Sequence, residues 1–207
     1  MQTKVTDLFY KLDSSTYNHS IRVMLIASEI EESLSFADHG LRDAALLHDI
    51  GKIYVSPVIL DKVGKLSVLE REIVDLHPYI GYKILQEFGV DENICRIVLY
   101  HHGEHPITIQ EVSKCRSDYV LKRASMLHTI DVFEALTSDR PYHRGVPAAE
   151  ALKIMIKEKD HNPEVIKYIA NGISGNSSID SAIHRCYRQD NSNSVMYALN
   201  HIQKKAI

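Results

Sequence analysis

The stretch AALLHDIGK, residues 44–52, decides how this 207-residue chain is interpreted. It places two strong metal ligands, the imidazole of His48 and the carboxylate of Asp49, directly after an apolar run with helical spacing. A buried carboxylate without a cation is costly, so Asp49 needs a partner of opposite charge. We therefore expect a buried metal site at this dipeptide, with further ligands supplied by distant parts of the chain.

Composition and charge exclude several classes of protein. With 24 basic and 27 acidic residues the formal net charge is −3, which gives no general basic surface for a nucleic-acid polymer or an anionic membrane. No apolar run approaches the ~20 residues needed to span a bilayer, and the N-terminus lacks the apolar centre of a secretory signal. Three scattered cysteines predict neither a disulfide framework nor a thiolate zinc site. We expect a cytoplasmic protein with reduced thiols.

Apolar residues recur at helical spacing along nearly the whole chain, which predicts an all-α fold. Ser14 or Ser15 and then Asp38 are expected to cap the first two helices, and Ser67 opens a capping box. The expected helices cover about 14–33, 38–51, 67–77, 78–89, 91–102 and 118–138, with two more that start at Pro147 and Pro163. Residues 53–66 are expected to form a loop with a short helical turn. We expect one domain over 1–170, followed by a linker near 171–178 and a helical tail, which together make up 171–207.

The candidate ligands lie on the apolar sides of their helices. His19, for example, shares a stripe with Val23, Ile26 and Ile30. A satisfied core histidine is the simpler interpretation of any one of them alone. Five histidines and two aspartates in one core would, however, leave many polar groups unsatisfied without a metal. Imidazole and carboxylate ligands without a thiolate favour Fe, Mn or another first-row divalent ion. The predicted ligands are His19, His48, Asp49, His77, His101, His102 and Asp131.

HDIGK and its flanking residues resemble the HD superfamily of metal-dependent phosphohydrolases, and further blocks resemble its HD-GYP branch. These blocks occur in the order of the family over about residues 15–170. They are NHSIRV at 18–23, the segment 56–66, HPYIG at 77–81, HH at 101–102 and DVFEALTSDRPY at 131–142. The resemblance implies an HD-domain helical bundle around a buried metal site.

The resemblance also implies a role for each ligand. His19, His48, Asp49 and Asp131 would hold one metal, and Asp49 would bridge to a second metal held by His77, His101 and His102. The implied reaction is hydrolysis of a phosphodiester by a metal-bridging hydroxide, with a cyclic dinucleotide as substrate and cyclic di-GMP as first choice.

Lys52 and Arg140 are the expected substrate contacts. Lys52, three residues past Asp49, is close enough to reach a phosphate oxygen or to aid protonation of the leaving group, and it is counted with Asp49 among the catalytic residues. A solvated lysine at the helix end is the alternative. Arg140 could clamp a phosphate, or it could form a structural ion pair with Asp139 or Glu134.

The chain departs from the HD-GYP pattern in three places. Gly103-Glu104-His105-Pro106-Ile107-Thr108-Ile109-Gln110 replaces the GYP-containing loop that the branch uses to bind cyclic di-GMP. Ser15 stands where some members have a glutamate and bind a third metal, so two metals are expected here. His143 stands where many members have lysine or arginine. A nucleotide phosphomonoesterase and a non-catalytic metal- or nucleotide-binding signalling module therefore stay open as alternatives, as does a homodimer or a signalling partner.

Overall fold

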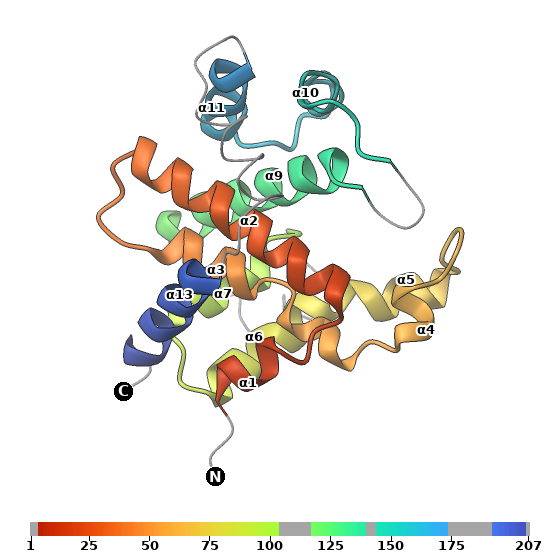
Figure 1. Cartoon of the computed structure of the whole chain (residues 1–207), viewed down its shortest axis with the longest axis vertical. Helices are drawn as coiled ribbons and strands as arrows, with labels where there is room; N and C mark the ends of the chain where they lie inside the picture. The colour runs from red at the N-terminus through yellow and green to blue at the C-terminus, as the bar shows by residue number, and fades with distance from the viewer. Residues whose placement is uncertain (1–3, 104–116, 140–143, 174–191, 206–207) are drawn as a thin grey trace.

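The computed structural model describes residues 4–103, 117–139, 144–173 and 192–205 (Figure 1). Every regular element in these ranges is a helix, which confirms the predicted all-α class. None of these helices combines the length and the apolarity that crossing a membrane requires. The elements are α1 (Val5–Phe9), α2 (Ser14–Ser33), α3 (Gly40–Leu47), the 3-10 helix η1 (Ile50–Tyr54), α4 (Pro57–Leu60), α5 (Val68–Asp75), α6 (His77–Glu87), α7 (Glu92–Tyr100), α9 (Asp118–Thr137), α10 (Ala148–Lys157), α11 (Pro163–Ile173) and α13 (Ser192–Lys205).

Helix α3 is the centre of the bundle. All eight of its residues are buried, because α2, α7, α9 and α13 pack around it (Figure 1). A helix that is covered on all sides needs side chains that are small, apolar or paired: residues 44–47 are alanines and leucines, and the buried Arg42 and Asp43 form an ion pair. The metal ligands His48 and Asp49 follow directly, so the most buried helix delivers them to the middle of the protein.

The start of α2 and both ends of α3 differ from the sequence prediction, whereas α2 ends at Ser33 as predicted. Asp13 caps α2 by accepting a hydrogen bond from the amide of Thr16 at 2.9 Å, whereas Ser14 is already the first helical residue. Helix α3 begins at Gly40, two residues later than predicted, and ends at Leu47, four residues earlier than predicted. Asp49 has φ −97° and ψ 7°, outside the helical region, and the chain continues as η1. This break turns the Asp49 carboxylate out of the helix and toward the other ligands.

A buried acid holds the start of α3. The carboxylate of Glu31 accepts hydrogen bonds from the amides of Leu41 and Arg42, at 2.8 Å and 3.2 Å. These amides have no partner within α3, and the positive end of the helix dipole favours the negative charge. Asp38, the predicted cap, accepts from the amide of Gly40 at 2.8 Å, and Glu31 satisfies the next two amides.

Other helix boundaries follow the predicted signals. Ser67 and Glu70 form the reciprocal capping box at the start of α5. Asp91 caps α7, and Pro78 lies in the first turn of α6, where its missing N–H costs nothing. These signals are local in the chain, which explains why they could be recognised without tertiary information.

An exposed apolar arm, residues 54–69, extends from the body of the protein. It contains α4 and the start of α5, which lie together at the right of Figure 1. Neither α4 nor α5 has a buried residue. Five large apolar side chains on the arm are exposed, from 67% for Leu69 to 81% for Val58, the others being Tyr54, Val63 and Val68. The predicted short turn within 53–66 corresponds to α4.

The C-terminal helix α13 shares the main core. It buries Val195, Ala198, Leu199 and Ile202 and contacts α1 and α3. Its His201 lies 2.7 Å from the buried carboxylate of Asp43 on α3. The predicted linker is helical as far as Ile173, and the rest of it lies outside the described residues. The division of the chain at residue 170 stays a prediction.

Two glycines allow η1 and α6 to approach closely. A Cβ atom on Gly51 would lie 2.1 Å from the carbonyl oxygen of His77 and 2.7 Å from the amide nitrogen of Gly81. A Cβ on Gly81 would meet the side chain of Ile50 at 3.3 Å. The backbone contact at Gly51 cannot be relieved by a rotamer change, so the position of His77 beside Asp49 depends on this glycine.

We expect Gly51→Ala to be clearly more destabilising than Gly81→Ala. Overpacking of this kind costs about 1–3 kcal/mol, and Gly51 should lie at the upper end because its neighbour is backbone. In a chain of this size that lowers the melting temperature by roughly 2–4 °C per kcal/mol. Thermal unfolding of the two variants measures the difference. Equal melting temperatures would show that η1 and α6 can separate without cost.

Candidate metal centre

Three of the predicted histidine ligands lie where helices end. His48 follows α3, His101 follows α7, and His77 begins α6 directly after α5. Their Nδ1 atoms lie 2.8, 2.7 and 2.6 Å from the carbonyl oxygens of Ala45, Val74 and Val98, respectively. Each carbonyl belongs to the last turn of the preceding helix, where backbone oxygens lack intrahelical partners. Since a carbonyl only accepts, each Nδ1 carries the proton and each Nε2 keeps a free lone pair.

His19 and Asp131 come from the middle of the two longest helices among the described residues, α2 and α9. The Nε2 atom of His19 lies 2.9 Å from an oxygen of Asp131 and 3.7 Å from an oxygen of Asp49. The Nδ1 atom of His19 is bonded to the carboxylate of Glu134 instead of to a carbonyl. His19 therefore also presents Nε2 to the centre, but a different partner orients it.

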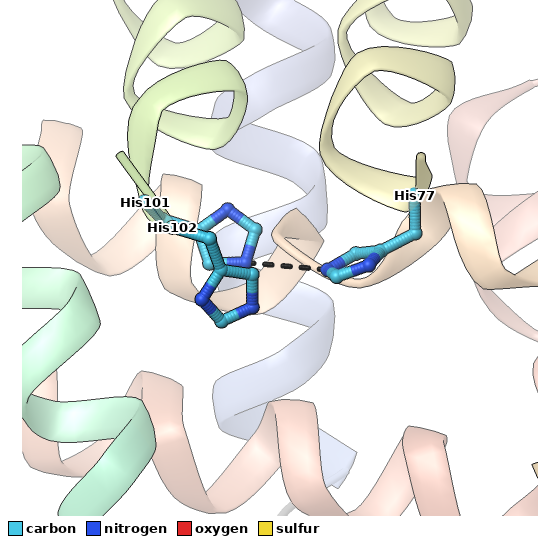
Figure 2. A group of neighbouring side chains, drawn as sticks. All are labelled: His77, His101 and His102. Carbon is cyan, nitrogen blue, oxygen red and sulfur yellow. Dashed lines mark hydrogen bonds between the residues drawn. The ribbon is translucent and has the colours of Figure 1, made fainter. Parts of the chain in front are cut away.

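The structure brings all seven predicted ligands together. Asp49, which is 1% exposed, lies between the groups: one of its oxygens is 3.2 Å from Nε2 of His77 and the other is 3.5 Å from Nε2 of His48. Figure 2 shows His77, His101 and His102 converging, with 3.4 Å between Nε2 of His77 and Nε2 of His101. Three sets have ligand atoms that all lie within 4.8 Å of one another: His77, His101 and His102; His19, His48 and Asp131; and His48, Asp49 and His101.

Two buried atoms at this centre have no hydrogen-bond partner among the described residues. They are Nε2 of His48 and Oδ1 of Asp49. Buried polar atoms are almost always satisfied, and both of these are good donors of a lone pair to a cation. A divalent metal ion at this position would satisfy both, so the residues present fit the metal that the sequence predicts.

The protonation states of His48, His77, His101 and Asp49 also suit a metal. Burial lowers the pKa values of His48, His101 and His77, that of His77 to about 3, so these rings are neutral at pH 7. Burial alone would raise the pKa of Asp49, but the neighbouring His48 and Lys52 hold it well below its usual range. The pKa of His19 is raised to about 9, because its hydrogen bonds to carboxylates outweigh the effect of burial. The centre thus holds anionic carboxylates and mostly neutral imidazoles.

Lys52 lies on η1 and contacts a predicted ligand. Its Nζ atom is 2.7 Å from an oxygen of Asp49, and its side chain is 21% exposed. It is therefore a partly buried cation at the edge of the metal centre and not a solvated lysine. Arg140, the other predicted substrate contact, lies outside the described residues, as does most of the loop that replaces the GYP segment.

Sequence reasoning missed the role of Glu134, which it considered only as a partner for Arg140. Its carboxylate accepts hydrogen bonds from His19, Arg22 and Ser138. The spacing contained a signal: Glu134 follows Asp131 by three residues and Arg22 follows His19 by three, so each pair shares one helix face. What the sequence could not show is that these two faces meet.

Comparisons with known proteins agree with this centre. The family model of the HD domain matches residues 16–136. A cyclic di-GMP phosphodiesterase of Pseudomonas aeruginosa is 34% identical over 166 residues, which are 78% of this chain and 40% of that protein. The 3′3′-cGAMP-specific phosphodiesterase 3 of Vibrio cholerae is 36% identical over 143 residues, 68% of this chain and 31% of that protein.

A solved structure shows the same fold. It is the HD domain of the L. monocytogenes phosphodiesterase PgpH, with a TM-score of 0.58 and 20% identity, and the alignment covers 81% of this chain and 99% of that one. The match to the family model covers more than half of the 207 residues and includes all seven converging ligands. The chain therefore belongs to the HD domain family.

Proposed function

We propose that this chain is a metal-dependent phosphodiesterase that hydrolyses a cyclic dinucleotide, with cyclic di-GMP as the first choice. The observation that carries the proposal is the convergence of seven ligands, five of them buried, around two unsatisfied atoms, Nε2 of His48 and Oδ1 of Asp49. The two bacterial phosphodiesterases described above support the substrate class, since both are named for cyclic dinucleotides. This chain spans less than half of either relative, so the substrate is assigned by analogy.

We assign the ligands to two ions, Fe or Mn being favoured. His19, His48, Asp49 and Asp131 would hold the first ion, and His77, His101 and His102 the second, with Asp49 shared. Seven ligands exceed the six positions of one octahedral ion, and the position of Asp49 between the two groups supports the sharing. Two divalent ions together supply water activation and stabilise the charge that develops on a phosphodiester.

Lys52 is assigned to the substrate. In the structure its ammonium group neutralises Asp49. With cations on Asp49 that interaction weakens, and the lysine is free to bind a non-bridging phosphate oxygen at the edge of the same centre. Arg140 is proposed as a second phosphate contact on the strength of the family resemblance alone.

The altered loop at 103–110 supports two other functions, a nucleotide phosphomonoesterase and a metal-binding module without turnover. The rates of hydrolysis of bis(p-nitrophenyl) phosphate and of p-nitrophenyl phosphate with added Mn(II) distinguish these two functions from the proposed phosphodiesterase. Faster hydrolysis of the diester supports the proposal. Faster hydrolysis of the monoester supports a phosphomonoesterase, and metal binding without either activity supports the signalling module.

We expect the purified chain to contain about two first-row metal ions, and Asp49→Ala to lose more metal than any other single ligand substitution. The reason is that Asp49 faces both ligand groups. Elemental analysis after purification measures the metal content, and the matched comparison is His102→Ala, which removes a ligand from one group only. If neither Mn(II) nor Fe(II) binds or raises the melting temperature, the histidines are ordinary core residues.

Lys52→Ala should lower turnover while the metal content stays near that of the wild type, because the lysine contacts a ligand but is not one. Lys65→Ala is the control, since Lys65 is an exposed lysine on the nearby arm. Steady-state kinetics on the diester and metal analysis should be done on the same preparations. Unchanged kcat and KM in Lys52→Ala would remove this residue from the site.

Cyclic di-GMP should be favoured only weakly over cyclic GMP-AMP, because the loop that the HD-GYP branch uses for recognition is replaced. Remote contacts normally convert binding energy into orientation at the reacting phosphorus. Parallel measurements of kcat/KM for both substrates and for a linear dinucleotide check this. A preference for cyclic di-GMP of ~10³ or more, or about 4 kcal/mol, would mean that another segment recognises the bases.

A further inference from the structure

Glu134 is a buried acid that touches a predicted metal ligand without facing the centre itself. It lies on α9, one turn after Asp131, and its side chain is 2% exposed. Its carboxylate accepts hydrogen bonds from the guanidinium of Arg22 and from Nδ1 of His19. A buried carboxyl group paired with a guanidinium is an anion, so the group that accepts the Nδ1 proton of His19 is a carboxylate.

This arrangement differs from that of the other three buried histidines. His48, His77 and His101 donate to neutral carbonyl oxygens that are free because their helices end there. His19 is the sixth residue of a 20-residue helix, where the surrounding carbonyls are used by the helix itself. Its orientation has to come from another helix, and α9 supplies it through Glu134.

The carboxylate of Glu134 is itself held in place. The Nε–H of Arg22 and the hydroxyl of Ser138 both donate to its Oε1, while His19 donates to its Oε2. These contacts fix both oxygens, so the acid stays behind His19 and does not swing toward the ions. A carboxylate behind a ligating imidazole fixes its tautomer and increases its basicity.

We propose that Glu134 is a positioning residue that makes the metal position formed by His19, His48 and Asp131 the tighter of the two. The proposal rests on the two-metal centre proposed above. At the position formed by His77, His101 and His102, no carboxylate among the described residues backs a ring in this way: His77 and His101 are backed by carbonyl oxygens, and the side chain of His102 is 41% exposed. With Asp49 shared, the first position thus combines the carboxylates of Asp131 and Asp49 with a histidine backed by an anion, whereas the second has three imidazoles and only the shared carboxylate.

The first test is stepwise binding of Mn(II) to the full chain after its metal has been removed with a chelator. The wild type should bind two ions with separate Kd values, and Glu134→Gln should raise the lower Kd by about 10–100-fold. Glu31→Gln is the matched control, because Glu31 is an equally buried glutamate that binds backbone amides and lies 3.5 Å from His39, which is not a predicted metal ligand. It should change neither Kd. Glu134→Asp, which keeps the charge, should recover part of the loss.

The second test identifies the positions. With one equivalent of Zn(II), imidazole ¹⁵N NMR should show that His19 is bound before His77. In the fully loaded protein, Glu134→Gln should shift the Nδ1–H resonance of His19 and leave that of His77 in place. If Glu134 only stabilised the fold, Glu134→Gln would lower the melting temperature and would not affect the Nδ1–H resonance of His19 more than that of His77. If Glu134→Gln does not fold, the proposal is tested by the wild type alone, from whether His19 or His77 binds Zn(II) first.

The outcomes separate the two proposals. Fewer than two bound ions in the wild type would overturn the two-metal assignment itself. Two ions that bind in the wild type with equal affinity, a filling order that starts at His77, or unchanged Kd values in Glu134→Gln would overturn only the role of Glu134.

Discussion

The burial of the Asp49 carboxylate is the constraint on which the rest of the structure depends. An ion with 1% exposure inside an apolar bundle is stable only if positive charge or hydrogen bonds surround it. Lys52 supplies part of that charge, while Oδ1 keeps no hydrogen-bond partner among the described residues. The break between α3 and η1, the close approach at Gly51 and the convergence of imidazoles all place groups that bind a cation around this one side chain.

Features that depend on short stretches of sequence could be predicted. The capping box at Ser67, the cap at Asp91 and the helical start at Pro78 were recognised because each signal involves residues within one turn. The seven ligands were found because several ordered blocks resembled one family. Predictions failed where a distant side chain decides the outcome. Glu31 caps α3 from another helix, and Glu134 meets His19 across 115 residues of chain. The packing of α13 on α3 could not be predicted for the same reason, because these helices are far apart in the sequence.

The metal centre and the recognition of a particular substrate depend on different parts of the chain. The chemistry of the centre is determined by residues that the structure describes, and the family match covers all of them. Recognition of a particular dinucleotide depends on groups beyond the reacting phosphate, and Arg140 and residues 104–116 lie outside the described ranges. The two relatives act, by their names, on cyclic dinucleotides that differ in one base.

Three imidazoles donate hydrogen bonds to carbonyl oxygens in the last turn of the preceding helix. The length of each of these helices therefore determines the position and orientation of the histidine that follows it. Inserting one residue into α3, α5 or α7 would rotate the following histidine by about 100° around the helix axis and advance it by about 1.5 Å. It would also change which carbonyl is free to orient that ring. We therefore expect changes in length to be tolerated in the connections that precede these helices, 34–39, 61–67 and 88–91, and not within the helices. A designer who transplants this centre to another bundle must copy three helix endings as well as seven side chains.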